Sequence, residues 1–322
     1  MTRLTKIRVA LARFRPLLVL RSLLHVPRLL GNRELYKRYG IRRSVFRTLA
    51  ARDVPVDAAD PREVPWLDRP DAAEALAADP GLDRFPEPVQ ASIRAWPDNG
   101  YAVLEGFFGP ELIDRINGEI AEQMEAGRLG FNRGGDRIRN VFQRCPSAAE
   151  AVLDPGLTDI LSYVLGREVG IWQSISFFRG SRQAAHSDAF HMTTAPQGNL
   201  IAIWIALEDI TPECGPVFYL PGTHKMKQIV TEDLGLQNGS KLFVADKTTA
   251  YYERIKQQVK DSGVQPVRFL PNKGDVLIWH SNLLHGGGPI TDPQSTRRSL
   301  VAHYYGKDTL RWHEVAEHPS LV

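Results

Sequence analysis

The stretch Leu200-Ile-Ala-Ile-Trp-Ile-Ala-Leu207 is apolar at every position. A strand with one face in water alternates apolar and polar residues, so an unbroken apolar run predicts a strand that is buried on both faces. Similar short runs lie on either side of it: Gly100–Leu104, Val169–Phe178, Val217–Leu220, Val267–Leu270, Asp275–Trp279 and Ser299–Tyr305. Many short strands separated by turn residues are typical of a sandwich or jelly roll.

Helical patterns accompany these strands. Pro110 to Ala126 has a proline at its start and apolar residues at helical spacing, and Leu157 to Leu165 is a second such segment. The sequence therefore predicts a mainly β domain with flanking α-helices over residues 96–322. Residues 225–265 interrupt the strand pattern with an expected helix, Thr249–Lys260, and we interpret them as an insertion that serves as a substrate lid.

Charge divides the region that precedes this domain. The formal net charge of the 322-residue chain is only +3, but residues 1–50 hold thirteen Lys or Arg against one acid. Residues 51–100 hold eleven acids against five arginines. We therefore expect a basic arm over residues 1–52, followed by an acidic, proline-rich linker over residues 53–95.

The basic arm carries an amphipathic pattern. Leu4, Ile7, Leu11, Phe14 and Leu18 recur at helical spacing, with arginines between them. Three interpretations are open: a helix packed on the outside of the main domain, a helix on an anionic membrane surface, and a nucleic-acid contact. The aromatic residues do not interleave with the basic ones as stacking platforms would, so we expect no nucleic-acid partner.

Composition also bears on location. No run approaches the roughly 20 apolar residues that a membrane-spanning helix needs. Only two cysteines occur, Cys145 and Cys214, which excludes a disulfide framework and disfavours a zinc site built from thiolates. We expect a cytoplasmic protein, with peripheral membrane association through the basic arm as the open alternative.

The triplet His186-Ser187-Asp188 and a distant histidine, His285, suggest metal chemistry. On a strand, residues 186 and 188 point to the same face, so an imidazole and a carboxylate can reach one ion. Two histidines and one carboxylate are the ligand set of non-haem Fe(II) oxygenases. His280 competes with His285 for the third position. It lies five residues earlier and has the opposite strand parity, so only one of the two should face the metal.

Two arginines begin the last predicted strand. A buried arginine can clamp a carboxylate through two parallel hydrogen bonds. Because neighbouring residues on a strand face opposite sides, only one of Arg297 and Arg298 can point to the same site.

Several strings resemble one protein family in their order and spacing. They are Gln183-Ala-Ala-His186-Ser-Asp188, Trp204-Ile-Ala-Leu207, Cys214-Gly-Pro-Val-Phe-Tyr-Leu-Pro221-Gly-Thr-His224-Lys225, Lys273-Gly-Asp-Val-Leu-Ile-Trp-His280, His285-Gly-Gly and Arg297-Arg-Ser-Leu-Val-Ala-His-Tyr304. From about Gly100 to Gly306 the chain resembles the phytanoyl-CoA dioxygenase family. The resemblance implies a double-stranded β-helix, which is a cupin-like jelly roll, with Fe(II) as the metal and 2-oxoglutarate and O₂ as co-substrates.

The same resemblance implies roles for individual residues. Those that match the family's metal triad are His186, Asp188 and His285. The candidate contacts to 2-oxoglutarate are Arg297, Trp204, Gln183 and Arg298, with Arg297 preferred for the far carboxylate. Related halogenases lack the carboxylate at the position of Asp188, so its presence here favours hydroxylation over halogenation.

The predicted function is that of an Fe(II)- and 2-oxoglutarate-dependent dioxygenase. We expect it to hydroxylate an unactivated C–H bond of a small-molecule or lipid-like substrate and to release succinate and CO₂. Desaturation, epoxidation or cyclisation in a biosynthetic pathway would use the same cofactors, because the outcome depends on how the substrate is posed. A non-catalytic cupin-like binding protein is the alternative from another class, and Asp188 together with a clamp arginine disfavours it.

Overall fold

The computed structural model describes residue 11 and residues 14–55, 64–132, 137–235, 246–315 and 317–319. Its main sheet has six antiparallel strands, in the spatial order β1 (Tyr101–Leu104), β8 (Val276–His280), β5 (Leu200–Ala206), β10 (Ser299–Gly306), β3 (Val169–Phe177) and β2 (Arg137–Arg139). Five of these strands were predicted, to within one residue at each end. The short strand β2 was not.

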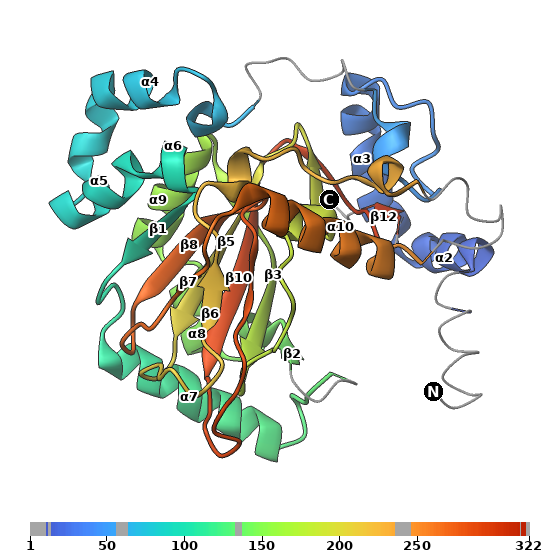
Figure 1. Cartoon of the computed structure of the whole chain (residues 1–322). Coiled ribbons are helices and arrows are strands. Elements are labelled where there is room, and N and C mark those ends of the chain that lie inside the picture. The colour runs from blue at the N-terminus through green and yellow to red at the C-terminus, as the bar shows by residue number, and fades with distance from the viewer. Residues whose placement is uncertain are drawn as a thin grey trace.

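The two faces of the main sheet are both buried, as the apolar run in β5 predicted. Ile201, Ile203 and Ile205 point into one hydrophobic cluster, whereas Ala202, Trp204 and Ala206 belong to another. The first cluster is covered by helices, of which α7 lies below the sheet and α5 to its left in Figure 1: α5 (Glu87–Arg94), α7 (Pro110–Glu125), α8 (Pro146–Val152) and α9 (Pro155–Leu165). The helices predicted near residues 110 and 157 are thereby confirmed.

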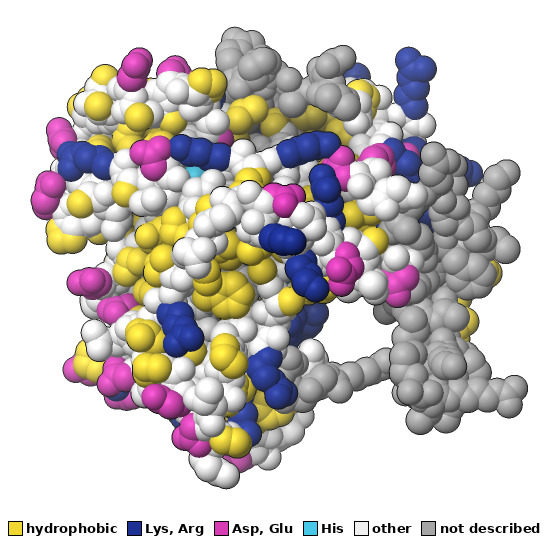
Figure 2. Space-filling view, viewed as in Figure 1, with side chains coloured by type: hydrophobic (Ala, Val, Ile, Leu, Met, Phe, Trp, Pro, Cys, Tyr) yellow, Lys and Arg dark blue, Asp and Glu magenta, His cyan; other side chains and the backbone are white. Residues whose placement is uncertain are grey.

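A second β layer lies over the other face of the main sheet. It contains one three-stranded sheet of β7 (Val267–Arg268), β6 (Val217–Tyr219) and β9 (His285–Gly287), and another of β12 (His318–Pro319), β11 (Leu310–His313) and β4 (Thr193–Ala195). Val217 and Tyr219 of β6 share a hydrophobic cluster with Trp204 and Val301 of the main sheet. Two facing layers of antiparallel strands form the predicted jelly roll. Hydrophobic side chains gather over β6 and β7 in Figure 2, where Val267 is exposed.

Residues 64–95, interpreted above as part of a linker, are folded onto the domain. They include α4 (Ala72–Ala78) and α5, and α6 (Trp96–Asn99) follows them. Phe85, Val89 and Ile93 recur every four residues and are buried in the same cluster as the main sheet. The hydrophobic core therefore includes residues that precede the predicted domain boundary at residue 96. The acidic residues obscured a helical pattern whose apolar members are few but regularly spaced.

Residues 15–38 of the basic arm are helical. They comprise α2 (Arg15–Ser22), the single turn Leu23–His25 and α3 (Val26–Arg38). Leu29 and Tyr36 of α3 are buried against Leu310 and Trp312 of β11, so this helix packs on the outside of the domain. The predicted positions Leu4 and Ile7 lie outside the described residues. Among the helices that are described, none has the length and apolar character to cross a membrane.

The insertion contributes one long helix, α10 (Thr248–Ser262), close to the predicted bounds. Its buried side chains, Tyr251 and Ile255, share a cluster with Phe190 and Leu284. This helix crosses in front of the upper ends of the main strands in Figure 1. Because it is packed against the segments that carry His186 and His285, it serves as a support for them, and the prediction of a lid does not describe α10.

Candidate metal centre and its pocket

The structure brings His186, Asp188 and His285 together. One ligand atom of each lies within 4.8 Å of the others, and all three side chains are buried. The backbone fixes two of them, because His186 N donates to His285 O at 2.9 Å and His285 N donates to His186 O at 3.0 Å. Asp188 lies outside any strand and begins a short 3₁₀ turn, Asp188–Phe190. The residues predicted to form the site therefore meet, although the triplet is not on a regular strand.

Hydrogen bonds set which nitrogen of each histidine is available. Nδ1 of His186 lies 3.0 Å from the carbonyl oxygen of Ala184, and Nδ1 of His285 lies 3.0 Å from that of Leu283. A carbonyl oxygen only accepts, so each Nδ1 carries the hydrogen and each Nε2 presents a lone pair. The Nε2 atoms face Asp188, at 3.9 Å from Oδ1 for His186 and 3.7 Å from Oδ2 for His285. Two bare imidazole nitrogens and a carboxylate suit a divalent transition metal.

Asp188 is itself held from outside the triad. The indole Nε1 of Trp279 donates to Asp188 Oδ2 at 2.9 Å, and Nε2 of His303 lies 3.3 Å from the same oxygen. Burial alone would raise the pKa of Asp188, but the imidazoles of His285 and His303 outweigh it and hold the pKa below its ordinary value. Asp188 is therefore an anion at neutral pH, while burial lowers the pKa of His186 and keeps that ring neutral.

The backbone between the two ligands of the triplet is tied to the insertion. Ser187 N donates to the hydroxyl oxygen of Tyr251 at 2.7 Å. The Tyr251 ring stacks on Phe190, with ring centroids 3.9 Å apart and planes 6° apart. This contact explains how a segment outside regular secondary structure keeps a defined shape, and the sequence analysis missed it because no local pattern links residues 187 and 251.

A pocket of about 290 Å³ opens beside the triad on the inner face of the main sheet. Arg297 and Trp204 lie in it, both almost fully buried. Arg297 donates from Nη1 to Gly215 O at 3.3 Å, whereas its Nε and the Nε1 of Trp204 are buried donors without a partner among the described atoms. Burial lowers the pKa of Arg297 to about 10, so the guanidinium stays charged at neutral pH. Buried, unpaired donors next to a positive charge fit a carboxylate.

The other two predicted co-substrate contacts have different outcomes. Gln183 lines the pocket, where its Oε1 accepts a hydrogen bond from Arg137 Nη2 at 2.6 Å and its Nε2 donates to Tyr252 Oη at 3.3 Å. Arg298 is not part of the pocket lining. Its Nε lies 3.8 Å from Glu208 Oε2, and 40% of its side chain is exposed. The prediction that Arg298 contacts the co-substrate is therefore not supported, and strand alternation gives the reason.

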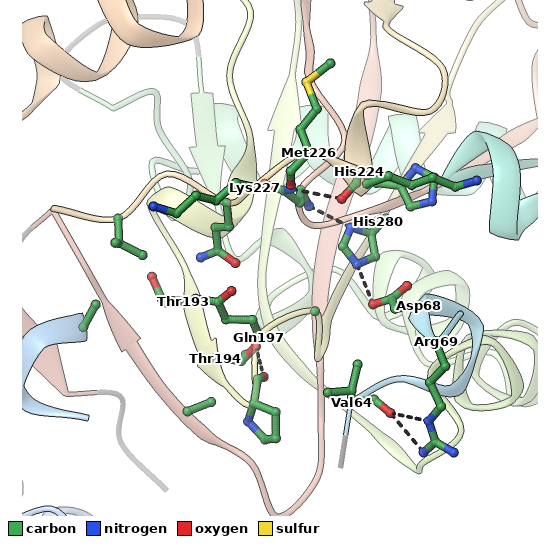
Figure 3. A pocket seen from close by; sticks show the side chains of 18 of the residues that line it. Val64, Asp68, Arg69, Thr193, Thr194, Gln197, His224, Met226, Lys227 and His280 are labelled. Carbon is green, nitrogen blue, oxygen red and sulfur yellow. Dashed lines mark hydrogen bonds and ion pairs between the residues drawn. The ribbon is translucent and has the colours of Figure 1, made fainter. Parts of the chain in front are cut away.

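His280, the alternative to His285, faces a different cavity. This cavity measures about 1280 Å³ and shares no described lining residue with the metal pocket. Figure 3 shows His280 beside Asp68, with His280 Nε2 3.0 Å from Asp68 Oδ2. Its Nδ1 accepts from the backbone N–H of Asn282, so Nε2 donates to the carboxylate. Both nitrogens are engaged, so His280 is outside the triad. Parity predicted that only one of His280 and His285 would face the metal, and the family resemblance assigned that position to His285.

Comparisons with known proteins identify the class. Residues 96–299 match the sequence profile of the family described as phytanoyl-CoA dioxygenase (PhyH). An ectoine dioxygenase from Sphingopyxis alaskensis is 26% identical over 215 residues, which are 61% of this chain and 70% of that enzyme. The human peroxisomal phytanoyl-CoA dioxygenase is 28% identical over 130 residues, 40% of this chain and 35% of that enzyme.

Solved structures show the same fold. The carbocyclase SnoK from nogalamycin biosynthesis, a non-haem α-ketoglutarate-dependent enzyme, aligns with a TM-score of 0.55 and 16% identity over 72% of this chain and 88% of its own. EctD from S. alaskensis, with 2-oxoglutarate and 5-hydroxyectoine, aligns with a TM-score of 0.52 and 20% identity over 67% of this chain and 75% of its own.

Fold and family together define an oxygenase of the jelly-roll class that depends on iron and 2-oxoglutarate. The chain belongs to the phytanoyl-CoA dioxygenase family. The predicted reaction class, a 2-oxoglutarate-dependent dioxygenase with Fe(II) and O₂, is confirmed by this membership.

Proposed function

We propose that His186, Asp188 and His285 hold Fe(II), and that the chain hydroxylates an unactivated C–H bond of a small-molecule substrate. The proposal rests on one observation: a ligand atom of each of the three side chains lies within 4.8 Å of the other two, and both histidines use Nδ1 to contact a carbonyl oxygen. When bound, iron with 2-oxoglutarate and O₂ supplies the oxidising chemistry, with succinate and CO₂ as the other products.

The protein's own side chains bind the co-substrate, orient a metal ligand and shield the reacting bond from water. We propose that Arg297 and Trp204 hold the far carboxylate of 2-oxoglutarate, because their buried donors need an acceptor at that place. Trp279 and His303 keep Asp188 ionised and oriented. The pocket walls from Ile175 and Val301 are apolar, which limits the access of water to the reacting C–H bond.

The direct test is spectroscopic. Anaerobic protein with Fe(II) and 2-oxoglutarate should show a weak metal-to-ligand charge-transfer band in the visible range. His186→Ala should abolish it, whereas His280→Ala, which removes a histidine of the other cavity, should retain it. Arg297→Gln should weaken 2-oxoglutarate binding far more than Arg298→Gln. A wild-type protein that binds neither iron nor 2-oxoglutarate would contradict the proposal.

We also propose that the protein is cytoplasmic and that the end of α2 rests on an anionic membrane surface. Leu20 lies near the end of α2, Leu23 and Leu24 lie in the single turn that follows it, and their exposed fractions are 59%, 49% and 80%. The surrounding basic arm holds one acid among its first 50 residues. Exposed leucines among basic residues are the composition of interfacial helices.

Vesicle co-sedimentation tests the membrane proposal. Replacing Leu20, Leu23 and Leu24 with serine should reduce binding to vesicles that contain phosphatidylserine. Leu270→Ser is the matched control, because Leu270 is a leucine exposed to 48% elsewhere on the domain. Equal binding of the triple variant and the wild type, or no binding by the wild type, would contradict the membrane contact without bearing on the metal centre.

A further inference from the structure

The hairpin of β11 and β12 supplies part of the metal pocket. The two strands pair through Trp312 with Pro319 and through His313 with His318. His313 and Val315, at the start of the turn between them, both line the pocket. The match to the family ends at residue 299, so this part of the wall lies outside the sequence that the family shares.

His313 lies at the end of the pocket that is remote from Arg297. Arg297 precedes β10, and His303 is six positions further along, roughly 20 Å at the rise of an extended strand. The partner of His303 on β3 is Gln173. The ring of the adjacent Trp172 lies 5.2 Å from that of His313, measured between centroids. A co-substrate that is bound at Arg297 therefore leaves the His313 end of the pocket for the substrate.

Val315 continues this wall toward the triad. It packs against the hydrophobic cluster that contains Phe190, Tyr251 and Leu284, and Tyr251 is the residue that supports the backbone of the metal-binding triplet. The pocket measures only about 290 Å³, so the position of two side chains in its wall matters for what can enter.

The turn that carries Val315 also contains two buried carboxylates. The exposed fraction is 1% for both Glu314 and Glu317. Burial of a carboxylate is strongly unfavourable unless the group is paired and hydrogen-bonded. The position of the turn therefore depends on the groups that receive these two side chains.

Three cations surround Glu317. From the basic arm, Arg15 Nη2 lies 2.9 Å from Glu317 Oε2 and Arg52 Nη2 lies 3.2 Å from Oε1. From the insertion, Lys247 Nζ lies 3.2 Å from Oε1. Burial would raise the pKa of Glu317, but the three cations outweigh it and hold the pKa below its ordinary value. Glu317 is therefore an anion at neutral pH, and its charge ties the turn to the arm.

Glu314 is held by the same two segments. Its Oε2 accepts a hydrogen bond from the backbone N–H of Ala51 at 2.9 Å, and the hydroxyl of Thr231 donates to its Oε1. Lys247 Nζ donates to the carbonyl oxygen of Glu314 at 3.0 Å. In Figure 1, β12 lies beside α10 and α3, where these segments meet.

We propose that Arg15 and Arg52 are positioning residues of the active centre. By holding Glu317 they keep the β11–β12 turn in place, and with it His313 and Val315 as the wall that faces the substrate. This inference rests on the proposed function, because it takes the co-substrate to occupy the other end of the pocket. The basic arm then serves the reaction as well as the outer packing of the domain, since the wall excludes water from the reacting bond.

The first test places a thiol in the wall. Val315→Cys does so in a chain whose native cysteines, Cys145 and Cys214, are both buried. Its alkylation by iodoacetamide, in the full chain loaded anaerobically with Fe(II) and 2-oxoglutarate, reports how often the turn leaves the pocket. Adding Arg15→Gln and Arg52→Gln should raise the rate about 10-fold, as expected for the loss of two partly exposed ion pairs. Arg52→Lys in place of Arg52→Gln should recover most of this loss.

The second test asks whether the turn protects the metal, in protein that retains Val315. A bulky chelator should remove Fe(II) about 10-fold faster from the Arg15→Gln, Arg52→Gln variant. The dissociation constant of 2-oxoglutarate, measured from the charge-transfer band, should stay within about twofold. The matched control is Arg84→Gln, which removes an arginine that lies 2.9 Å from Asp159, outside the arm and the pocket. It should leave both rates unchanged.

Three results would overturn the inference: equal labelling rates with and without the two arginines, faster labelling without faster removal of iron, and an Arg84→Gln variant with the same effect as the double variant. Should the double variant fail to fold, Arg52→Gln alone leaves two cations on Glu317, and a rise of about threefold in both rates is then expected. A wild-type protein without a charge-transfer band would instead be a failure of the proposed function.

Discussion

Trp279→Phe should weaken metal binding, although Trp279 is not a proposed ligand. Its Nε1 donates to Asp188 Oδ2 at 2.9 Å in a buried environment. Phenylalanine keeps an aromatic ring but has no donor. Among the described side chains outside the triad, His303, at 3.3 Å, would then be the remaining restraint on the Asp188 carboxylate. The carboxylate would then be both less well oriented and less stabilised as an anion.

The size of the effect follows from the kind of hydrogen bond that is lost. A bond to a charged group contributes about 1.5–3 kcal/mol net, and loss of an outer contact to a metal ligand reduces affinity roughly 10- to 100-fold. These two figures agree, because about 1.4 kcal/mol corresponds to a tenfold change in a dissociation constant. We therefore expect the Fe(II) dissociation constant of Trp279→Phe to rise by one to two orders of magnitude.

The assay is an anaerobic Fe(II) titration against a competing chelator, with Trp66→Phe as the matched control. Trp66 Nε1 donates to the carbonyl oxygen of Tyr163 at 2.7 Å, remote from the pocket. Both variants lose an indole donor and similar volume, so both should unfold at lower temperature, but only Trp279→Phe should lose metal affinity. Equal metal affinity of Trp279→Phe and wild type would refute the assignment of Trp279 as a positioning residue.

Three further predictions concern stability. Tyr251→Phe leaves the buried Ser187 N–H without its acceptor, so the free energy of unfolding, measured with urea, should fall by about 1–3 kcal/mol. The same variant should lose part of its metal affinity. Lys247→Met removes the ammonium that lies 3.2 Å from the Glu317 carboxylate and should lower the free energy of unfolding by about 3 kcal/mol. This value is at the low end of the range for a buried ion pair, because two arginines still face that carboxylate. Burial lowers the pKa of His224 to about 4 from an ordinary value of 6.5. The folded state then binds fewer protons than the unfolded state between those values, so the free energy of unfolding should fall as pH drops from 6.5 to 4, by on the order of 3 kcal/mol. His224→Gln should flatten this part of the profile.

The strands of the main sheet were predictable because their signal is local. An apolar run such as 200–206 reports burial on two faces without reference to the rest of the chain. The triad was predictable for another reason: strand parity allowed only one of His280 and His285 at the metal, and the family resemblance selected His285. Arg298 was also open to exclusion by parity, and its exposure beside Glu208 agrees with that argument.

The remaining features depend on contacts between distant segments, which carry no local pattern. Residues 64–95 contain many acids, and their sparse apolar positions become core residues only because the helical face of the main sheet is there to receive them. The support of the triplet by Tyr251 joins positions 64 residues apart. Arg137 lies on a three-residue strand that is too short to recognise by its period, so its place in the pocket had to come from the pairing of β2 with β3.

The metal centre and the hydrophobic core use alternate residues of the same strands. On β8, Ile278 enters the cluster under the helices, while its neighbours Leu277 and Trp279 belong to the cluster on the inner face, where Trp279 also lines the pocket. On β10, Ala302 enters that cluster while His303 contacts Asp188. A shift of either strand by one residue would exchange these two faces. The same shift would therefore both remove a contact of Asp188 and expose core residues. The packing of helices on the far face of the sheet therefore fixes the register that places Trp279 and His303 against Asp188, so the stability of the fold and the orientation of this ligand depend on the same strand pairing.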